Sequence, residues 1–169
     1  MEIEEYKEKV LPTRDKLYRY AYFLLKNEED AKDVVQDVLL KIWDDRHKRK
    51  FDNIEAWAIT LIKNMAMDKL RRKKKNYSKE QDLLTLTDRA PTPDQRHATN
   101  HMYAHLQDQI QQLSEKQQNI FHLREIEGRS YQEISEALDL DISQVKVYLH
   151  RARKFLKDKL FKIESYGLH

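Results

Sequence analysis

Residues 130–160, SYQEISEALDLDISQVKVYLHRARKFLKDKL, decide the fold because they predict two helices separated by a short turn. Ser130 and Glu133 have the spacing of a capping box, so a helix is expected to begin there. Asp139 interrupts the helical pattern, and Asp141 is a suitable N-cap for a second helix. Apolar residues of that second helix recur at spacings of three and four, which predicts a buried stripe of Val145, Leu149, Ala152, Leu156 and Leu160.

The opposite face of the second helix carries cations and hydrogen-bonding groups. Two helices joined by a short turn, the second one basic, are what insertion of a recognition helix into the major groove of DNA requires. The stretch is therefore a helix-turn-helix candidate. A helical hairpin with a solvated basic face and no DNA ligand is the alternative that the spacing alone leaves open. The outward residues are Lys146, Val147, His150, Arg151, Arg153 and Lys154.

The composition predicts an all-α protein of one or two small domains. Of 169 residues, 40% are hydrophobic and 36% charged, and only 2 are glycine and 3 proline, which suits helices better than sheets. Cysteine is absent, which excludes disulfides and thiolate metal sites and is compatible with a reducing compartment. No apolar run approaches the roughly 20 residues of a membrane span, and the acidic N-terminus is unlike a signal peptide. We expect a soluble, cytoplasmic protein.

The N-terminal half predicts three further helices. The first begins at Pro12, which a first helical turn tolerates, and continues to Asn27. Asn27 then caps a second helix, whose first turn is acidic and favours the positive end of the helix dipole. Asp52 or Asn53 opens the third. The inward positions expected are Ala31, Val34, Val35, Val38, Leu39, Ile42 and Trp43 in the second helix, and Ile54, Trp57, Ala58, Leu61, Ile62 and Met65 in the third.

The outward face of the third helix leads into a run of cations. Thr60, Asn64 and Asp68 lie four apart, and Tyr77 follows the run. Hydrogen-bonding side chains that lead into cations form a surface suited to phosphates, with the tyrosine available for stacking. A solvated helix end that interacts only with its own dipole is the alternative from the residues alone. The cations are Lys69, Arg71, Arg72, Lys73, Lys74 and Lys75.

Helical periodicity fades after Asn76, and two of the three prolines follow. We therefore expect a flexible linker over 77–100 between small helical domains at 1–76 and 101–169. His97, His101 and His105 fall four apart, but no carboxylate motif accompanies them, so we expect a polar helix face and no metal or other cofactor.

The C-terminal domain has its own start and stop signals. Ser114 and Gln117 form a second capping-box pair, and Gly128 can close that helix in the left-handed conformation. The shared core expected is Ile120, Leu123, Ile134, Leu138, Val145, Leu149 and Leu156.

Four segments in this order resemble the extracytoplasmic-function (ECF) sigma factors of the sigma-70 family. They are DAKDVVQDVLLKIW at 30–43, AWAITLIKNMAMDKLRRKKK at 56–75, SYQEISEAL at 130–138 and VKVYLHRAR at 145–153. Each is moderately specific alone, but together they span nearly the whole chain. The resemblance implies a two-domain factor that binds bacterial core RNA polymerase, recognises the minus-ten and minus-thirty-five promoter elements and assists DNA melting, with no catalysis of its own.

The resemblance also implies site residues on three surfaces. The polar face of the second helix would dock on the polymerase clamp through Asp30, Asp33, Gln36, Asp37, Leu40 and Trp43. The third helix and its approach would bind and help melt the minus-ten element through Asn53, Trp57, Lys63, Asn64, Asp68, Arg71 and Arg72. The recognition helix would read the minus-thirty-five element through Lys146, Val147, His150 and Arg151, with Gln144, Arg153 and Lys154 on phosphates.

Two departures from the family pattern bear on the recognition helix. Asp139 stands where the family often has glycine, and because aspartate tolerates a left-handed backbone, we expect the turn to survive. Val147 replaces a small polar residue and can offer only apolar contact, for instance to a thymine methyl.

The resemblance further implies an anti-sigma factor, commonly membrane-anchored, as a partner. The rival function is a stand-alone helix-turn-helix regulator that binds duplex DNA as a dimer. Such a regulator needs neither the polar face at 30–43 nor the cation run, so their presence favours the sigma factor. No nucleophile beside a base and no carboxylate cluster has catalytic spacing, and we expect no enzymatic activity.

Overall fold

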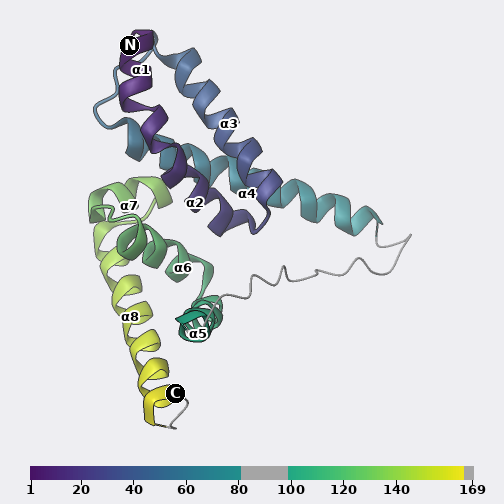
Figure 1. Cartoon of the computed structure of the whole chain (residues 1–169), viewed down its shortest axis with the longest axis vertical. Coiled ribbons are helices and arrows are strands. Elements are labelled where there is room, and N and C mark those ends of the chain that lie inside the picture. Colours follow the sequence, from purple (N-terminus) through teal and green to yellow (C-terminus); the bar gives the residue numbers. More distant parts are fainter. Residues whose placement is uncertain (81–98, 166–169) are drawn as a thin grey trace. The chain divides into compact units, whose positions relative to one another are not determined.

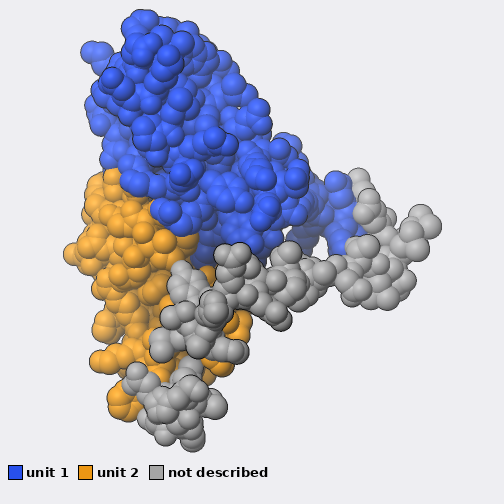
Figure 2. Space-filling view, viewed as in Figure 1, with its two compact units in different colours: residues 1–85, 136–139 blue, residues 86–135, 140–169 orange. Residues whose placement is uncertain are grey.

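The computed structural model describes residues 1–80 and 99–165, and within those ranges the secondary structure is entirely helical (Figure 1). The chain divides into two compact units, one formed mainly before and one mainly after the undescribed segment (Figure 2). The prediction of an all-α fold is confirmed. Most of the expected linker lies outside the described residues, and the last helix before it continues to Glu80, past the boundary expected at 76. None of the described helices has both the length and the apolarity needed to cross a membrane.

The first unit contains helices α1 (Ile3–Lys9), α2 (Arg14–Leu25), α3 (Glu28–Asp45) and α4 (Ile54–Glu80). The expected start at Pro12 is corrected: Pro12 lies in a 3-10 turn over Leu11–Thr13, and α2 begins after it. Lys26 ends α2 in the left-handed conformation with φ 51°. The Asn27 side chain then accepts a hydrogen bond of 3.0 Å from the Asp30 amide, which confirms Asn27 as the cap of α3.

The core of the first unit is formed where α2, α3 and α4 pack together. The expected inward face of α3 is buried except for Leu39 and Trp43, which are half-buried. In α4 the expected inward positions Ala58 and Ile62 are confirmed as buried, whereas Ile54, Trp57, Leu61 and Met65 are only half-buried. Trp57 packs beside the ring of Phe51, with centroids 5.0 Å apart, and stays partly exposed. The buried residues of α4 are Ala58, Ile59, Ile62 and Ala66.

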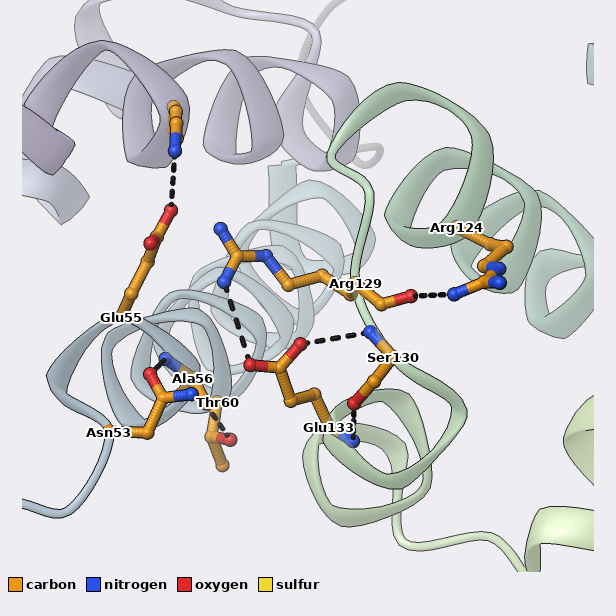
Figure 3. A network of polar contacts seen from close by, with 9 residues as sticks. Asn53, Glu55, Ala56, Thr60, Arg124, Arg129, Ser130 and Glu133 are labelled. Atoms are coloured by element: carbon orange, nitrogen blue, oxygen red, sulfur yellow. Dashed lines mark hydrogen bonds and ion pairs between the residues drawn. The ribbon is translucent and has the colours of Figure 1, made fainter.

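The second unit contains α5 (Thr99–Gln111), α6 (Glu115–Phe121), a π-helical turn over His122–Ile126, the first part of α7 (Tyr131–Leu138) and α8 (Ile142–Ser165), while Glu136–Asp139 are assigned to the first unit. Both predicted capping boxes are present. The Ser114 hydroxyl accepts from the Gln117 amide at 3.2 Å, and the Gln117 side chain accepts from the Ser114 amide at 3.1 Å. The equivalent bonds between Ser130 and Glu133 measure 3.1 and 2.9 Å (Figure 3).

Two left-handed residues fix the ends of the helices around the helix-turn-helix. Gly128 has φ 66°, as predicted for the residue that closes the preceding segment. Asp139 has φ 54°, so aspartate does adopt the conformation that glycine usually provides in this turn. Asp141 precedes α8 as predicted, but the observed cap bond runs from its amide to the Gln144 side chain at 3.0 Å.

The interior of the second unit follows the predicted apolar stripe of α8. Val145, Leu149, Ala152 and Leu156 are all buried, and Leu113 packs with the last two of them. Leu138 and Leu160 were expected in the core but are only half-buried. The π-helical turn was not predicted; within it His122 Nε2 lies 3.2 Å from Glu127 Oε1, and both side chains are almost completely buried.

Candidate nucleic-acid and protein interfaces

The outward side of α3 presents an acidic face with one exposed leucine. Asp33, Gln36, Asp37 and Leu40 follow one another at spacings of three, one and three, so they lie on one side of the helix. All four are exposed, and Leu40 is 54% exposed. Carboxylates around an exposed apolar residue are chemically suited to a protein partner with basic groups and an apolar pocket.

The predicted Trp43 lies at the far end of α3 and is partly covered. The Tyr6 ring meets it edge to face at 5.1 Å, and the Arg46 guanidinium lies 3.7 Å from its ring centre. These contacts fix the indole against α1 and the loop after α3, so Trp43 offers only part of its surface to a partner.

Asp30 differs from the other acidic residues of α3. Its side chain is only 14% exposed, and Lys69 Nζ lies 3.5 Å from its Oδ1. Lys73 pairs with its other oxygen, and Lys69 is also 3.6 Å from Asp33. Burial raises the pKa of Asp30, but the hydrogen bond and charge of Lys73, with Lys69, outweigh it, so the pKa lies below its ordinary value. Asp30 was predicted as one of the polymerase-docking residues, and in the structure two lysines of α4 already hold its carboxylate.

The start of α4 is built by residues that were predicted to bind DNA. The Asn53 side chain accepts a 2.9 Å hydrogen bond from the Ala56 amide and so caps the helix (Figure 3). Trp57 packs between Phe51 and Arg49, whose guanidinium is 5.2 Å from the indole ring centre. Both residues thus stabilise this end of the helix while part of each remains accessible.

One side of α4 brings together most of the predicted minus-ten residues. Trp57, Asn64, Asp68 and Arg71 follow one another at spacings of seven, four and three, which places them on the same side of the helix. Asn64, Asp68, Arg71 and Arg72 are exposed, and Asp68 forms an ion pair with Arg71. Lys63 lies at the flank of this face and is half-buried.

The predicted recognition helix α8 presents a continuous outward face. Val147, His150, Arg151 and Lys154 have helical spacings of three, one and three, and all are exposed. An apolar group, an imidazole and two cations on one helix face can contact thymine methyls, base edges and phosphates.

Three residues of α8 that were predicted to contact DNA already interact with other residues of the second unit. The Lys146 ammonium lies 5.6 Å from the Tyr131 ring centre, and the Gln144 oxygen caps α8. Arg153 forms an ion pair with Glu125, and this hydrogen bond raises the pKa of Arg153. The charge of Arg153 is therefore partly neutralised before any nucleic acid binds.

Of the three histidines spaced four apart, only His105 has a side chain that the structure describes. His97 lies outside the described residues, and His105 is exposed on α5. Across the described residues, no group of three histidine or acidic side chains has the geometry to hold a metal ion.

Comparison with known families accounts for both units. Residues 10–76 match the family model of sigma-70 region 2, and residues 104–156 match that of sigma-70 region 4. The chain is 30% identical over 139 residues to RNA polymerase sigma factor YlaC of Bacillus subtilis, an alignment that covers 79% of each protein. The chain belongs to the ECF sigma factors of the sigma-70 family. This family is not a catalytic one.

Other relatives of this sigma factor carry the same family name. It is 28% identical over 155 residues to ECF RNA polymerase sigma factor SigE of Mycolicibacterium smegmatis, covering 89% of this chain but only 60% of that protein. It is 25% identical over 160 residues to ECF RNA polymerase sigma factor SigW of Bacillus subtilis, covering 87% and 84%. Its fold is similar to that of the sigma factor RpoE solved in complex with the anti-sigma factor NepR from Bartonella quintana, with TM-score 0.76, 23% identity and coverage of 94% and 98%.

The ion pairs of Lys69 and Lys73 were missed in the sequence, although a signal for them was present. Lys69 and Lys73 continue the buried series Ile62 and Ala66 at spacings of four, three and four. A cation that continues an apolar stripe is expected to face the neighbouring helix, and here the acidic first turn of α3 supplies its partner. Counting all six cations as one phosphate surface ignored this periodicity.

Proposed function

We propose that this sigma factor binds core RNA polymerase through α3 and promoter DNA through α4 and α8, and so directs promoter-specific initiation. The observation that carries the proposal is that regions 2 and 4 occur in order along the chain, each with an exposed face of suitable chemistry. The protein would contribute binding and melting energy and no bond chemistry, and it would act in the cytoplasm with the polymerase.

The proposed polymerase surface is the acidic face of α3. Asp33, Gln36, Asp37 and Leu40 form its exposed part, and the accessible edge of Trp43 extends it. Asp30 lies at the border of this surface, where its carboxylate is held by two lysines.

The proposed minus-ten surface is the side of α4 that begins at Asn53 and Trp57. Asn64 provides hydrogen bonds for an unpaired base, Asp68 orients Arg71, and Arg71 and Arg72 attract the phosphates of the melted strand. Lys63 would reach the strand from the flank.

The proposed minus-thirty-five surface is the outward face of α8. Val147, His150 and Arg151 would contact base edges in the major groove, and Lys154 a phosphate. Lys146 and Gln144 lie beside this face and would position the helix on the backbone. Arg153 can contribute to DNA binding only in competition with Glu125.

The proposed partners include an anti-sigma factor that covers the polymerase surface. The fold neighbour from Bartonella quintana was solved with such a protein, and another neighbour, CnrH, with the cytosolic domain of CnrY at TM-score 0.68 and 21% identity. The exposed face of α3 combines the apolar side chain of Leu40 with the acidic groups of Asp33 and Asp37 beside it, which suits such a partner.

Run-off transcription with purified bacterial core polymerase on a library of promoter fragments tests this function. The wild-type protein is expected to support initiation, and Asp37→Arg is expected to lower it by roughly tenfold or more because it places a like charge in a complementary interface. Asp15→Arg makes the same charge reversal on an exposed residue of α2 and serves as the matched control. The proposal would be contradicted if neither the wild type nor Asp15→Arg supported initiation while the wild type alone bound duplex DNA tightly and sequence-specifically.

A further inference from the structure

The cation run at the end of α4 has two sides with different surroundings. Lys69 and Lys73 continue the buried stripe and contact carboxylates of α3, as described above. Arg71 and Lys75, four positions apart, lie on the opposite side of the helix, and Arg72 lies on one flank between the two sides. Lys74 lies on the other flank and is exposed.

From this difference we infer that the cations of the run have two separate roles. Lys69 and Lys73 position α4 against α3, and Arg71, Arg72, Lys74 and Lys75 bind nucleic-acid phosphates. Asp30 is then a positioning residue that acts through the two lysines. The inference rests on the proposed function, since it assigns residues within the surface that would hold the melted strand.

The ion pairs can position α4 against α3 because of where Asp30 lies in the fold. Figure 1 shows α4 continuing as a single helix beyond the point where it passes the first turn of α3. Asp30 lies in that first turn, and its two oxygens contact lysines one helical turn apart on α4. A carboxylate that is 14% exposed and bound by two cations resists bending of the helix at this point more than a solvated pair would.

The ion pairs of Lys69 and Lys73 with α3 also reduce by two the number of cations available to bind DNA. Lys73 is bound to Asp30, so a phosphate could bind it only by breaking that ion pair and leaving the largely buried carboxylate with Lys69 alone. Lys74 forms no ion pair with any described carboxylate. Lys73 and Lys74 therefore carry the same charge and are both exposed, but a phosphate contact to Lys73 breaks an ion pair whereas one to Lys74 does not.

The adjacent pair provides a matched experiment on the full-length protein. Binding of fluorescein-labelled single-stranded DNA of mixed sequence is measured between about 50 and 200 mM salt, and the slope of log affinity against log salt counts the phosphate contacts. Lys74→Gln is expected to reduce the slope by about 0.7, the value for one contact to a single strand. Lys73→Gln is expected to leave the slope unchanged.

Asp30→Asn tests the positioning role separately. We expect a two- to fivefold lower affinity, about the factor that the loss of a weak ion pair gives, at an unchanged slope. Asp30→Glu should restore part of the affinity because it keeps the charge. A purely structural role for Asp30 predicts a lower melting temperature with no change in affinity below that temperature, and this result would overturn the positioning role.

The remaining outcomes also discriminate. Equal losses of slope in Lys73→Gln and Lys74→Gln would overturn the division, because both lysines would then contact phosphate. No loss in either variant would also overturn the division, because Lys74 would then contact no phosphate. Run-off transcription by the wild type tests the sigma function independently, since it depends on no assumption about these lysines.

Discussion

The inward faces of the two long cationic helices, α4 and α8, differ in their C-terminal halves. Along α8 the inward residues stay apolar through Leu156, and its cations lie outside that stripe. Along α4 the inward residues change from apolar, ending at Ala66, to Lys69 and Lys73. The change occurs where α4 passes the acidic first turn of α3. The cations of α4 that face α3 are therefore held in ion pairs, whereas those on the other sides of the helix remain exposed.

The largest expected effect tests whether the apolar stripe of α8 stabilises its unit more than the ion pairs of α4 stabilise theirs. Leu149 is 1% exposed, and Leu149→Ala is expected to lower the free energy of unfolding by about 2–5 kcal/mol because it leaves a cavity. Val147→Ala truncates a residue of the same helix that is 48% exposed, and should change the free energy of unfolding by less than about 0.5 kcal/mol. Urea unfolding followed by circular dichroism measures both. Equal effects would show that the α8 stripe is not the core.

The inward residues of α8 are easier to predict from the sequence than those at the end of α4, because the former are apolar and the latter are charged. Spacing of three and four assigns Val145, Leu149, Ala152 and Leu156 to the interior because apolar side chains have one preferred environment. Local hydrogen-bond chemistry likewise predicts the caps at Asn27, Ser114 and Ser130.

Charged side chains are harder to assign, because solvent, DNA and a neighbouring carboxylate all suit a lysine. The pairing of Lys73 with Asp30 depends on contacts between residues 43 positions apart, which no local pattern contains. The same holds for Arg153 and Glu125, which are 28 positions apart. The π-helical turn at His122 also follows from packing and has no signal in the spacing of apolar residues.

A smaller, pH-dependent effect is expected at Asp30. Asp30→Asn is expected to lower the free energy of unfolding by about 1 kcal/mol at neutral pH, the upper range for a partly exposed ion pair. Because the pKa of Asp30 is lowered in the folded protein, this stabilisation is present above the ordinary value of 3.8 and is lost as the pH falls through the folded value beneath it. The difference in urea midpoint between wild type and Asp30→Asn, measured at neutral pH and below pH 3.8, checks the sign. A difference that grows on acidification would contradict the ion pairs.

The smallest expected effect concerns Arg153, a cation of α8 that is held in an ion pair like the lysines of α4. Arg153 and Glu125 are 48% and 34% exposed, so Glu125→Gln should change stability by less than about 1 kcal/mol. If Glu125 withholds Arg153 from DNA, this variant should bind duplex DNA with a salt slope steeper by about 0.9, the value for one added phosphate contact. Glu115→Gln removes an exposed acidic charge from α6 and is the control for the change in net charge. An unchanged slope in Glu125→Gln would mean that Arg153 faces away from the DNA even when it is released, and its predicted phosphate contact would then be wrong.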